Sequence, residues 1–200
     1  MLSDKIAEIW TRVQQSLFPH IEATATYPIH MTLPAYNPFT YSRLTFEDAM
    51  REDLLQVRRK GKALILDSRP ASSTDLMNAF QLADKVFNGS DGCGAKTKVL
   101  VVFSDMVEQS GYYDFLKDDL TDARTHAIIA QEQSSGRLPD LHGVNVWVAG
   151  ATASPTGGVS PEKIFQIQRF WLRYFTACGA QIDKSRYATR LLNFQLPSPP

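Results

Sequence analysis

The chain has 200 residues, of which 44% are hydrophobic, and its 21 basic and 21 acidic side chains give a formal net charge of zero. This length and composition suit one domain with a hydrophobic core, and the zero net charge gives no reason to expect nucleic acid or an anionic membrane as a partner. The two cysteines lack CxxC spacing and the four histidines are scattered, which excludes a recognisable zinc motif or a disulfide framework.

No segment reaches the roughly 18 uninterrupted apolar residues that a membrane-spanning helix needs. The first ten residues, MLSDKIAEIW, carry charges where a signal peptide would have its apolar core. As written, the chain is therefore expected to be cytoplasmic and to have no membrane span, and a missing upstream segment would change the prediction of its compartment.

The N-terminal third predicts a helix, an extended segment and a second helix. Apolar residues recur at helical spacing from Leu2 to Leu17, and Pro19 ends that pattern. The stretch 21–33, IEATATYPIHMTL, is rich in Thr, Ile and Tyr and predicts a strand, in which Pro28 indicates an edge position or a break. A helix then follows from residue 45 to a glycine stop at residue 61.

From residue 62 onward, short apolar strands alternate with helices. The predicted strands are 62–67, 98–104 and 144–149, and the predicted helices begin near Ser73, Tyr112 and Pro161. This alternation indicates βα units and a mainly parallel sheet with right-handed crossovers. We expect a single α/β domain over residues 1–196, three-layered and Rossmann-like with helices on both faces of the sheet, followed by a disordered tail at 197–200.

The most informative stretch is KVLVVFSDMVEQ, residues 98–109, in which an apolar run ends in Ser104 and Asp105, with a second carboxylate at Glu108. A continuous apolar strand is typical of a sheet covered on both faces, and such sheets bind ligands at the carboxyl ends of their strands. A simpler explanation is also open, because Ser and Asp at a strand end often cap the following backbone N–H groups.

Two other predicted strands end at the same edge. The strand 62–67 is followed by Ser68, and the strand 144–149 by Gly150 and a Thr/Ser/Pro/Gly loop. Because the carboxyl ends of parallel strands lie together, we expect one partner-binding rim that consists of Asp67, Ser68, Ser104, Asp105, Glu108 and Thr152.

Three stretches, STDLMNAFQLAD at 73–84, KVLVVFSDMVEQ at 98–109 and GVNVWVAGA at 143–151, together resemble the second half of a von Willebrand factor type A (VWA) domain. Their order and spacing match that family. The resemblance covers about residues 60–180 and implies a mostly parallel sheet between helices. It also implies that Thr74 matches the metal-site threonine of the family and Asp105 the aspartate at the end of its fourth strand.

The first metal motif of that family, Asp-x-Ser-x-Ser, is absent. The nearest text, DSRPASS at 67–73, has the wrong spacing and directly precedes Thr74. A hard cation such as Mg²⁺ needs several oxygen ligands, and Thr74 with one or two carboxylates supplies too few. The resemblance thus implies an incomplete or absent metal-ion-dependent adhesion site, with Thr74 and Asp105 as candidate Mg²⁺ ligands and Asp67 as the weaker candidate.

We expect a protein–protein interaction module of VWA type that binds a protein partner at this rim. No catalytic residue and no organic cofactor are predicted, since the sequence has no Gly-x-Ser-x-Gly elbow and no histidine placed as its base. Two alternatives remain. One is an α/β enzyme acting on a phosphorylated or nucleotide-like small molecule, with Asp67 or Asp105 as acid, base or metal ligand. The other is a metal-free structural subunit of a larger assembly.

Side-chain patterns also predict the core. Phe103 and the aromatic residues of the C-terminal third are expected to be buried, and the latter are Trp147, Phe165, Phe170, Trp171, Tyr174 and Phe175. Four aspartates at helical spacing predict a solvated helix face, and these are Asp114, Asp118, Asp119 and Asp122.

Overall fold

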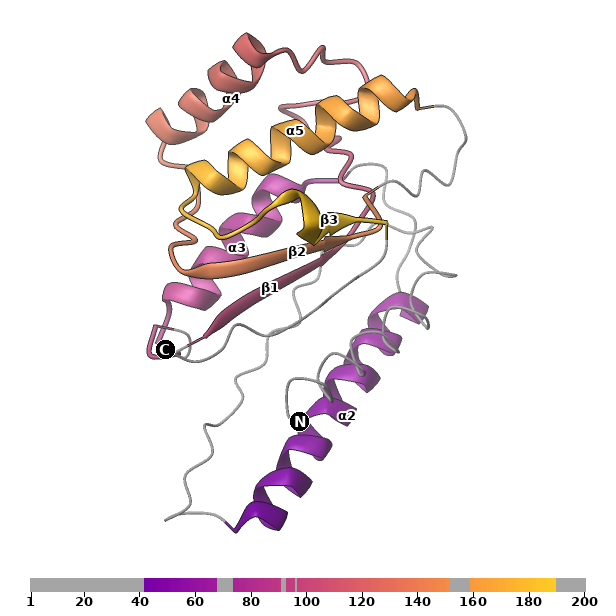
Figure 1. Ribbon diagram of the computed structural model, residues 1–200, viewed down its shortest axis with the longest axis vertical. Coiled ribbons are helices and arrows are strands. Elements are labelled where there is room, and N and C mark those ends of the chain that lie inside the picture. The colour runs from indigo at the N-terminus through magenta and orange to yellow at the C-terminus, as the bar shows by residue number, and fades with distance from the viewer. Residues whose placement is uncertain (1–41, 68–73, 91–92, 96, 152–158, 190–200) are drawn as a thin grey trace.

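A computed structural model describes residues 42–67, 74–90, 93–95, 97–151 and 159–189. The elements in these ranges are α2 (Arg43–Asp67), α3 (Leu76–Asn88), β1 (Lys98–Phe103), α4 (Asp122–Ser134), β2 (Val144–Ala149), α5 (Pro161–Ala177), the 3₁₀ turn η2 (Lys184–Arg186) and β3 (Tyr187–Ala188) (Figure 1). The predicted helix at 2–17, the predicted strand at 21–33 and the predicted tail at 197–200 lie outside the described residues.

The three strands form a parallel sheet in the order β1-β2-β3. In its register Lys98 lies opposite Val144 and Phe103 opposite Ala149, so the two longer strands are aligned along their whole length. The connections contain α4 between β1 and β2 and α5 between β2 and β3. The prediction that residues 98–104 and 144–149 form neighbouring parallel strands is confirmed, and the chain has an α/β fold.

The core lies between one face of this sheet and the helices α3 and α5. Val144, Val146 and Val148 point to that face, where they belong to one buried cluster with the aromatic side of α5. Phe80 of α3 packs edge-on against Trp171 and Phe175, with ring centroids 5.3 and 4.9 Å apart. Such edge-to-face contacts add to the free energy gained from burial alone.

Local capping signals place the helix starts. Asp75 accepts a hydrogen bond from the Asn78 backbone N–H at 3.0 Å, and Ser160 accepts one from Lys163 at 3.2 Å. Both caps satisfy N–H groups that a first helical turn leaves without partners. The helices predicted to start near Ser73 and Pro161 are therefore confirmed.

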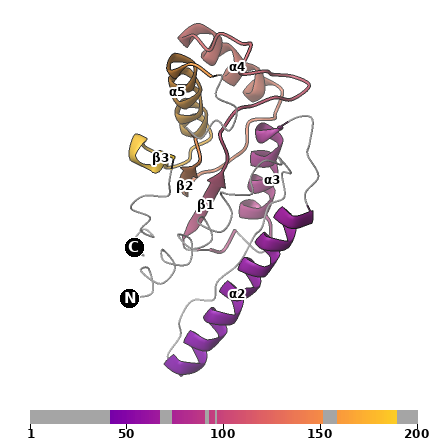
Figure 2. The same ribbon diagram turned by 90° about the vertical axis from the view of Figure 1, so that its right-hand side faces the viewer.

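The helices α2 and α4 lie at opposite ends of the described structure, as Figure 2 shows.

The predicted strand at 62–67 is wrong, because these residues form the last turns of α2. Short apolar runs of this kind do not distinguish a strand from a helix by periodicity. Ala63, Leu64 and Leu66 are good helix formers, and a single glycine inside a helix costs only about 1 kcal/mol. The helix that precedes the run therefore continues through Gly61.

The helix predicted from Tyr112 begins only at Asp122. The preceding residues fold back on themselves, and Gln109 bridges Asp114 in antiparallel fashion. This places Tyr113 and Phe115 in the core. Of the four aspartates expected on one helix face, only Asp122 is helical. The burial of Tyr113 and Phe115 favours this irregular loop over a helix, and the spacing of residues in the sequence does not predict that burial.

Most of the predicted aromatic core is confirmed, with the exception of Phe165, which is 54% exposed on α5. Phe103 is only partly buried, contrary to expectation. Within the described ranges, no helix is both long enough and apolar enough to cross a membrane.

Candidate functional site

The carboxyl ends of β1 and β2 share one edge of the sheet. The Ser104 N–H donates to the Ala149 carbonyl at 3.0 Å, and the Gly150 N–H donates to the Ala188 carbonyl at 3.1 Å. Asp105 and Gly150 therefore lie at the same edge, as predicted. Asp67 does not end a strand there, because it is the last residue of α2. Ser68 and Thr152, also predicted for the rim, lie outside the described residues.

Ser104 and Asp105 stabilise the turn that leaves β1. The Ser104 hydroxyl accepts from the Met106 N–H and the Asp105 carboxylate from the Val107 N–H, each at 3.0 Å. Between them Met106 adopts a φ of 64°, which is uncommon for any residue other than glycine. Burial raises the pKa of Asp105 despite these hydrogen bonds. The capping explanation therefore accounts for both side chains.

Met106 is tied to the core by its backbone. Its carbonyl oxygen accepts a hydrogen bond from the Trp171 indole N–H at 2.7 Å, and its side chain is fully buried. Left-handed backbone at such a residue persists only where the surroundings enforce it. The contact with α5 therefore fixes the path of the loop at its start. We call residues 104–121 the β1–α4 loop.

Glu108 joins this loop to α3. Its side chain is fully buried, and Oε2 accepts hydrogen bonds from the backbone N–H groups of Leu76 at 2.7 Å and Met77 at 3.3 Å. Backbone hydrogen bonds of 2.8 Å in both directions between Thr74 and Gln109 complete the connection. Oε1 has no hydrogen-bond partner among the described residues. Glu108 was expected at the partner-binding rim, but in this conformation a partner cannot reach it.

The pKa of Glu108 is raised to about 7, mainly by burial and to a smaller extent by the nearby Asp75 carboxylate, although the Ser110 hydroxyl and the Leu76 and Met77 N–H groups lower it. The hydrogen bonds and the positive end of the α3 dipole favour the carboxylate. Loss of hydration opposes them, and it is the larger effect. The carboxyl group therefore changes its charge near neutral pH.

The described residues do not supply a complete cation site. No three His, Cys, Asp or Glu side chains in the described ranges are grouped so that they could hold a metal ion. Asp105 uses Oδ1 to cap its own turn. A Mg²⁺ ion needs about six oxygen ligands, so Thr74 and Asp105 would require ligands from elsewhere. Their role as metal ligands stays a prediction.

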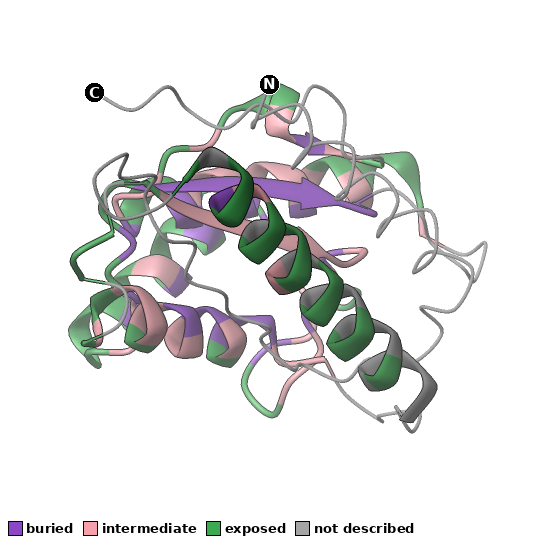
Figure 3. Ribbon diagram, turned by 90° about the horizontal axis from the view of Figure 1, so that it is seen from below, coloured by how far each residue is buried: buried purple, intermediate pink, exposed green. Residues whose placement is uncertain are grey.

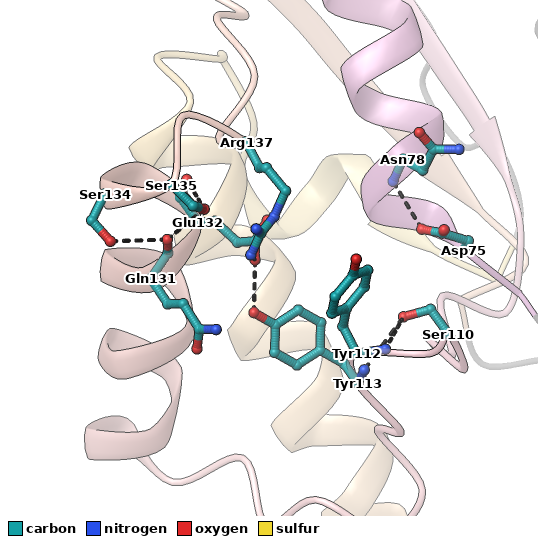
Figure 4. Close-up of polar contacts among 10 residues, drawn as sticks. All are labelled: Asp75, Asn78, Ser110, Tyr112, Tyr113, Gln131, Glu132, Ser134, Ser135 and Arg137. Carbon is teal, nitrogen blue, oxygen red and sulfur yellow. Dashed lines mark hydrogen bonds and ion pairs between the residues drawn. The ribbon is translucent and has the colours of Figure 1, made fainter.

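The loop has a second junction, with α4, which the sequence did not indicate (Figure 4). The Tyr113 hydroxyl donates to Glu132 Oε1 at 2.7 Å, and the Arg137 guanidinium donates to both carboxylate oxygens at 2.7 and 3.1 Å. Burial alone would raise the pKa of Glu132, but the Arg137 and Tyr113 hydrogen bonds outweigh burial and hold this pKa below its usual range. The Glu132 carboxylate is therefore charged and fully paired.

Tyr112 lies on the outer side of this junction and is 75% exposed. The Arg137 guanidinium carbon is 5.4 Å from the centroid of the Tyr112 ring, within the range of a cation–π contact. The backbone N–H groups of Tyr112 and Tyr113 both donate to the Ser110 hydroxyl at 3.3 Å. Figure 4 shows the two rings side by side below Arg137. Tyr112 is thus an exposed aromatic residue whose ring contacts Arg137 and whose backbone is hydrogen-bonded to Ser110.

The sequence contained one signal for this surface, the pair Tyr112-Tyr113. The helix predicted from Tyr112 gave no indication of the contacts that the pair makes with Glu132 and Arg137, which are distant in the sequence. Comparisons of the chain with protein-family models, curated proteins and solved structures found no match.

Proposed function

We propose that this chain is a protein-binding module of VWA type, with an incomplete metal-ion-dependent adhesion site, and that its partner docks on the β1–α4 loop at the carboxyl end of β1. Three features that resemble the VWA family support this assignment. Thr74 and Asp75 precede a helix, Asp105 follows an apolar strand, and the next strand, β2, is parallel to it.

The observation that carries the proposal is the exposed Tyr112 ring on Arg137. Tyrosine and arginine are the residues most enriched at energetic hot spots of protein interfaces, together with tryptophan. The Arg137 guanidinium is held by hydrogen bonds to both oxygens of the buried Glu132 carboxylate. A side chain that is already ordered loses less conformational entropy on binding, which favours affinity.

The two carboxyl groups near the end of β1, those of Asp105 and Glu108, favour binding over catalysis at this edge of the sheet. Asp105 is occupied with its own turn, and Glu108 is 0% exposed. An enzyme acting here would need an acid or base that a substrate can reach. Leu116, which is 41% exposed, is a second exposed apolar side chain of the same loop.

The test places a photo-crosslinking amino acid at Tyr112 of the full chain, in the cells that produce it, with the same amino acid at Phe165 as the matched control. Phe165 is a second exposed aromatic residue, on α5. We expect a discrete protein adduct from position 112 and none from position 165. Equal labelling at both positions, or none at 112, would contradict the proposal.

With the captured partner in hand, Tyr112→Ala should weaken its binding by about 30-fold or more, the effect of losing a hot spot of about 2 kcal/mol. Phe165→Ala should leave affinity within about twofold. Neither change should alter the thermal midpoint appreciably, since both rings are exposed. Excess EDTA should leave binding unchanged if the metal site is incomplete.

A further inference from the structure

A short segment of the β1–α4 loop, residues 107–112, is attached to the start of α3, and the loop is fixed on both sides of this segment by other helices. On one side the Met106 carbonyl accepts the Trp171 indole N–H of α5 at 2.7 Å. On the other side the Tyr113 hydroxyl donates to Glu132 of α4 at 2.7 Å (Figure 4). The segment can therefore separate from α3 while the loop on either side of it keeps its place.

Hydrogen bonds to backbone groups make the attachment. The Glu108 carboxyl group accepts the N–H groups of Leu76 and Met77 at 2.7 and 3.3 Å. These two groups belong to the first turn of α3, where N–H groups have no partner within the helix. Thr74 and Gln109 exchange backbone hydrogen bonds in both directions. All these backbone groups can be hydrated when the attachment opens, so opening leaves none of them buried without a partner.

The Glu108 carboxyl group is fully buried, and Oε1 has no hydrogen-bond partner among the described residues. The described titratable groups that face it are the Asp75 carboxylate before α3 and the Tyr174 phenol of α5, and the Ser110 hydroxyl lies on its loop side. Asp75 repels a negative charge on Glu108, and burial raises the pKa of Tyr174, which stays neutral. A charged Glu108 is thus stabilised by hydrogen bonds alone, without a cation among these groups.

We propose that residues 107–112 form a latch that is closed on α3 while Glu108 is protonated and opens toward water as Glu108 loses its proton. In the closed latch the carbonyl oxygen of a protonated carboxyl group still accepts the two α3 N–H groups. Opening returns to a charged carboxylate the hydration that burial removes. This inference does not depend on the proposed binding function.

The two states of Glu108 set the direction of the pH dependence. In the closed latch burial raises the pKa of Glu108 to about 7, and in the open latch the group has its ordinary value of 4.5. Between these values the closed latch binds more protons, so opening increases as pH rises from 4.5 to about 7 and levels off above that. From pH 5 to pH 8 the equilibrium constant for opening should increase about 70-fold.

Amide hydrogen exchange by NMR on the full chain, at about pH 5 and pH 8 and in low concentrations of urea, tests the proposal. Leu76, Met77 and Gln109 report on the latch. The control is Val146 of β2, a strand that is buried along its whole length (Figure 3), and its N–H donates to the Gln181 carbonyl. The measured exchange rates are corrected for the intrinsic effect of pH on amide exchange.

We expect the latch amides to be less protected than Val146, because they exchange through a local opening. Low urea should leave their exchange unchanged and should accelerate that of Val146, since only global unfolding exposes much surface. The protection of the latch amides should fall about 70-fold from pH 5 to pH 8.

Glu108→Gln separates the charge of this side chain from its shape, because the amide oxygen still accepts the two α3 N–H groups. In this variant the protection of the latch amides should change less than about threefold between pH 5 and pH 8. Glu162→Gln, at the exposed start of α5, is the matched control and should keep the wild-type change.

Three results would overturn the proposal, and the wild-type protein alone can give the first two. Latch amides that match Val146 in protection and in sensitivity to urea would mean that they exchange only when the whole protein unfolds. Protection that does not change with pH would mean that the charge on Glu108 does not open the latch. A pH dependence that persists in Glu108→Gln would mean that another group controls it.

Discussion

Two buried glutamates anchor the β1–α4 loop, and they differ in charge state. Glu132, at the α4 junction, has a cation beside it and a lowered pKa. Glu108, at the α3 junction, accepts backbone N–H groups on one oxygen; these and the Ser110 hydroxyl lower its pKa, but burial outweighs them and the pKa is about 7. Burial is nearly complete at both. At Glu132 the hydrogen bonds from Arg137 and Tyr113 outweigh burial, whereas at Glu108 burial outweighs the hydrogen bonds, so the balance of the two decides whether a buried carboxyl group stays charged.

The largest effect is expected at the α4 junction. Glu132→Ala should lower the free energy of unfolding by about 3 kcal/mol, because it removes a buried carboxylate and leaves the Tyr113 hydroxyl without its partner. Urea denaturation at neutral pH measures the change. Gln133→Ala, at the exposed neighbouring position of α4, should cost less than about 0.5 kcal/mol. Equal losses of unfolding free energy in Glu132→Ala and Gln133→Ala would show that the contacts of Glu132 do not stabilise the fold.

The α3 junction should make stability depend on pH. The pKa of Glu108 is about 7 in the folded protein, against 4.5 for an ordinary glutamate, so between these values the folded protein binds more protons than the unfolded chain. Wild-type stability should therefore fall as pH rises through this window, by at most about 3 kcal/mol. Unfolding free energies measured from pH 4 to 8 would show the slope.

Glu108→Gln should remove that slope, because the amide oxygen still accepts the α3 hydrogen bonds but carries no charge at any pH. Above pH 7 this variant should be more stable than the wild type. Glu162→Gln, at the exposed start of α5, should keep the wild-type profile. Parallel profiles for Glu108→Gln and the wild type would show that the N-terminus of α3 fully compensates the charge.

A smaller effect is expected for the hydroxyl that links the loop to α4. Tyr113→Phe removes a hydrogen bond to a charged group and should cost about 1.5 to 3 kcal/mol. Tyr112→Phe changes an exposed ring and should cost almost nothing. Thermal midpoints of the two variants, recorded side by side, isolate the buried hydroxyl. If both variants match the wild type, the Tyr113–Glu132 contact does not stabilise the loop.

The smallest effect is expected at the strand end. Asp105→Ala should cost about 1 kcal/mol, the scale of a lost cap, since the Asp105 carboxylate accepts the Val107 N–H. Asp105→Asn keeps an acceptor and should cost less. A loss above about 3 kcal/mol in the alanine variant would mean that Asp105 has a further buried partner.

Local patterns in the sequence determined the elements with long or unambiguous signals. The apolar runs at 98–104 and 144–149 and the capped amphipathic stretches at Asp75 and Ser160 are strands and helices in the structure. In each case the residues that favour the element are within one or two turns or one strand of each other, so the signal is complete in the local sequence.

Tertiary packing alone decided the remainder. Residues 62–67 joined a helix, and Tyr113 and Phe115 were drawn into the core instead of starting one. Glu108 lies 32 positions from Leu76, whose N–H it accepts. Tyr113 lies 19 positions from Glu132. Because no local pattern encodes contacts at such separations, the charge states of the two glutamates and the exposure of Tyr112 become visible only when the chain has folded.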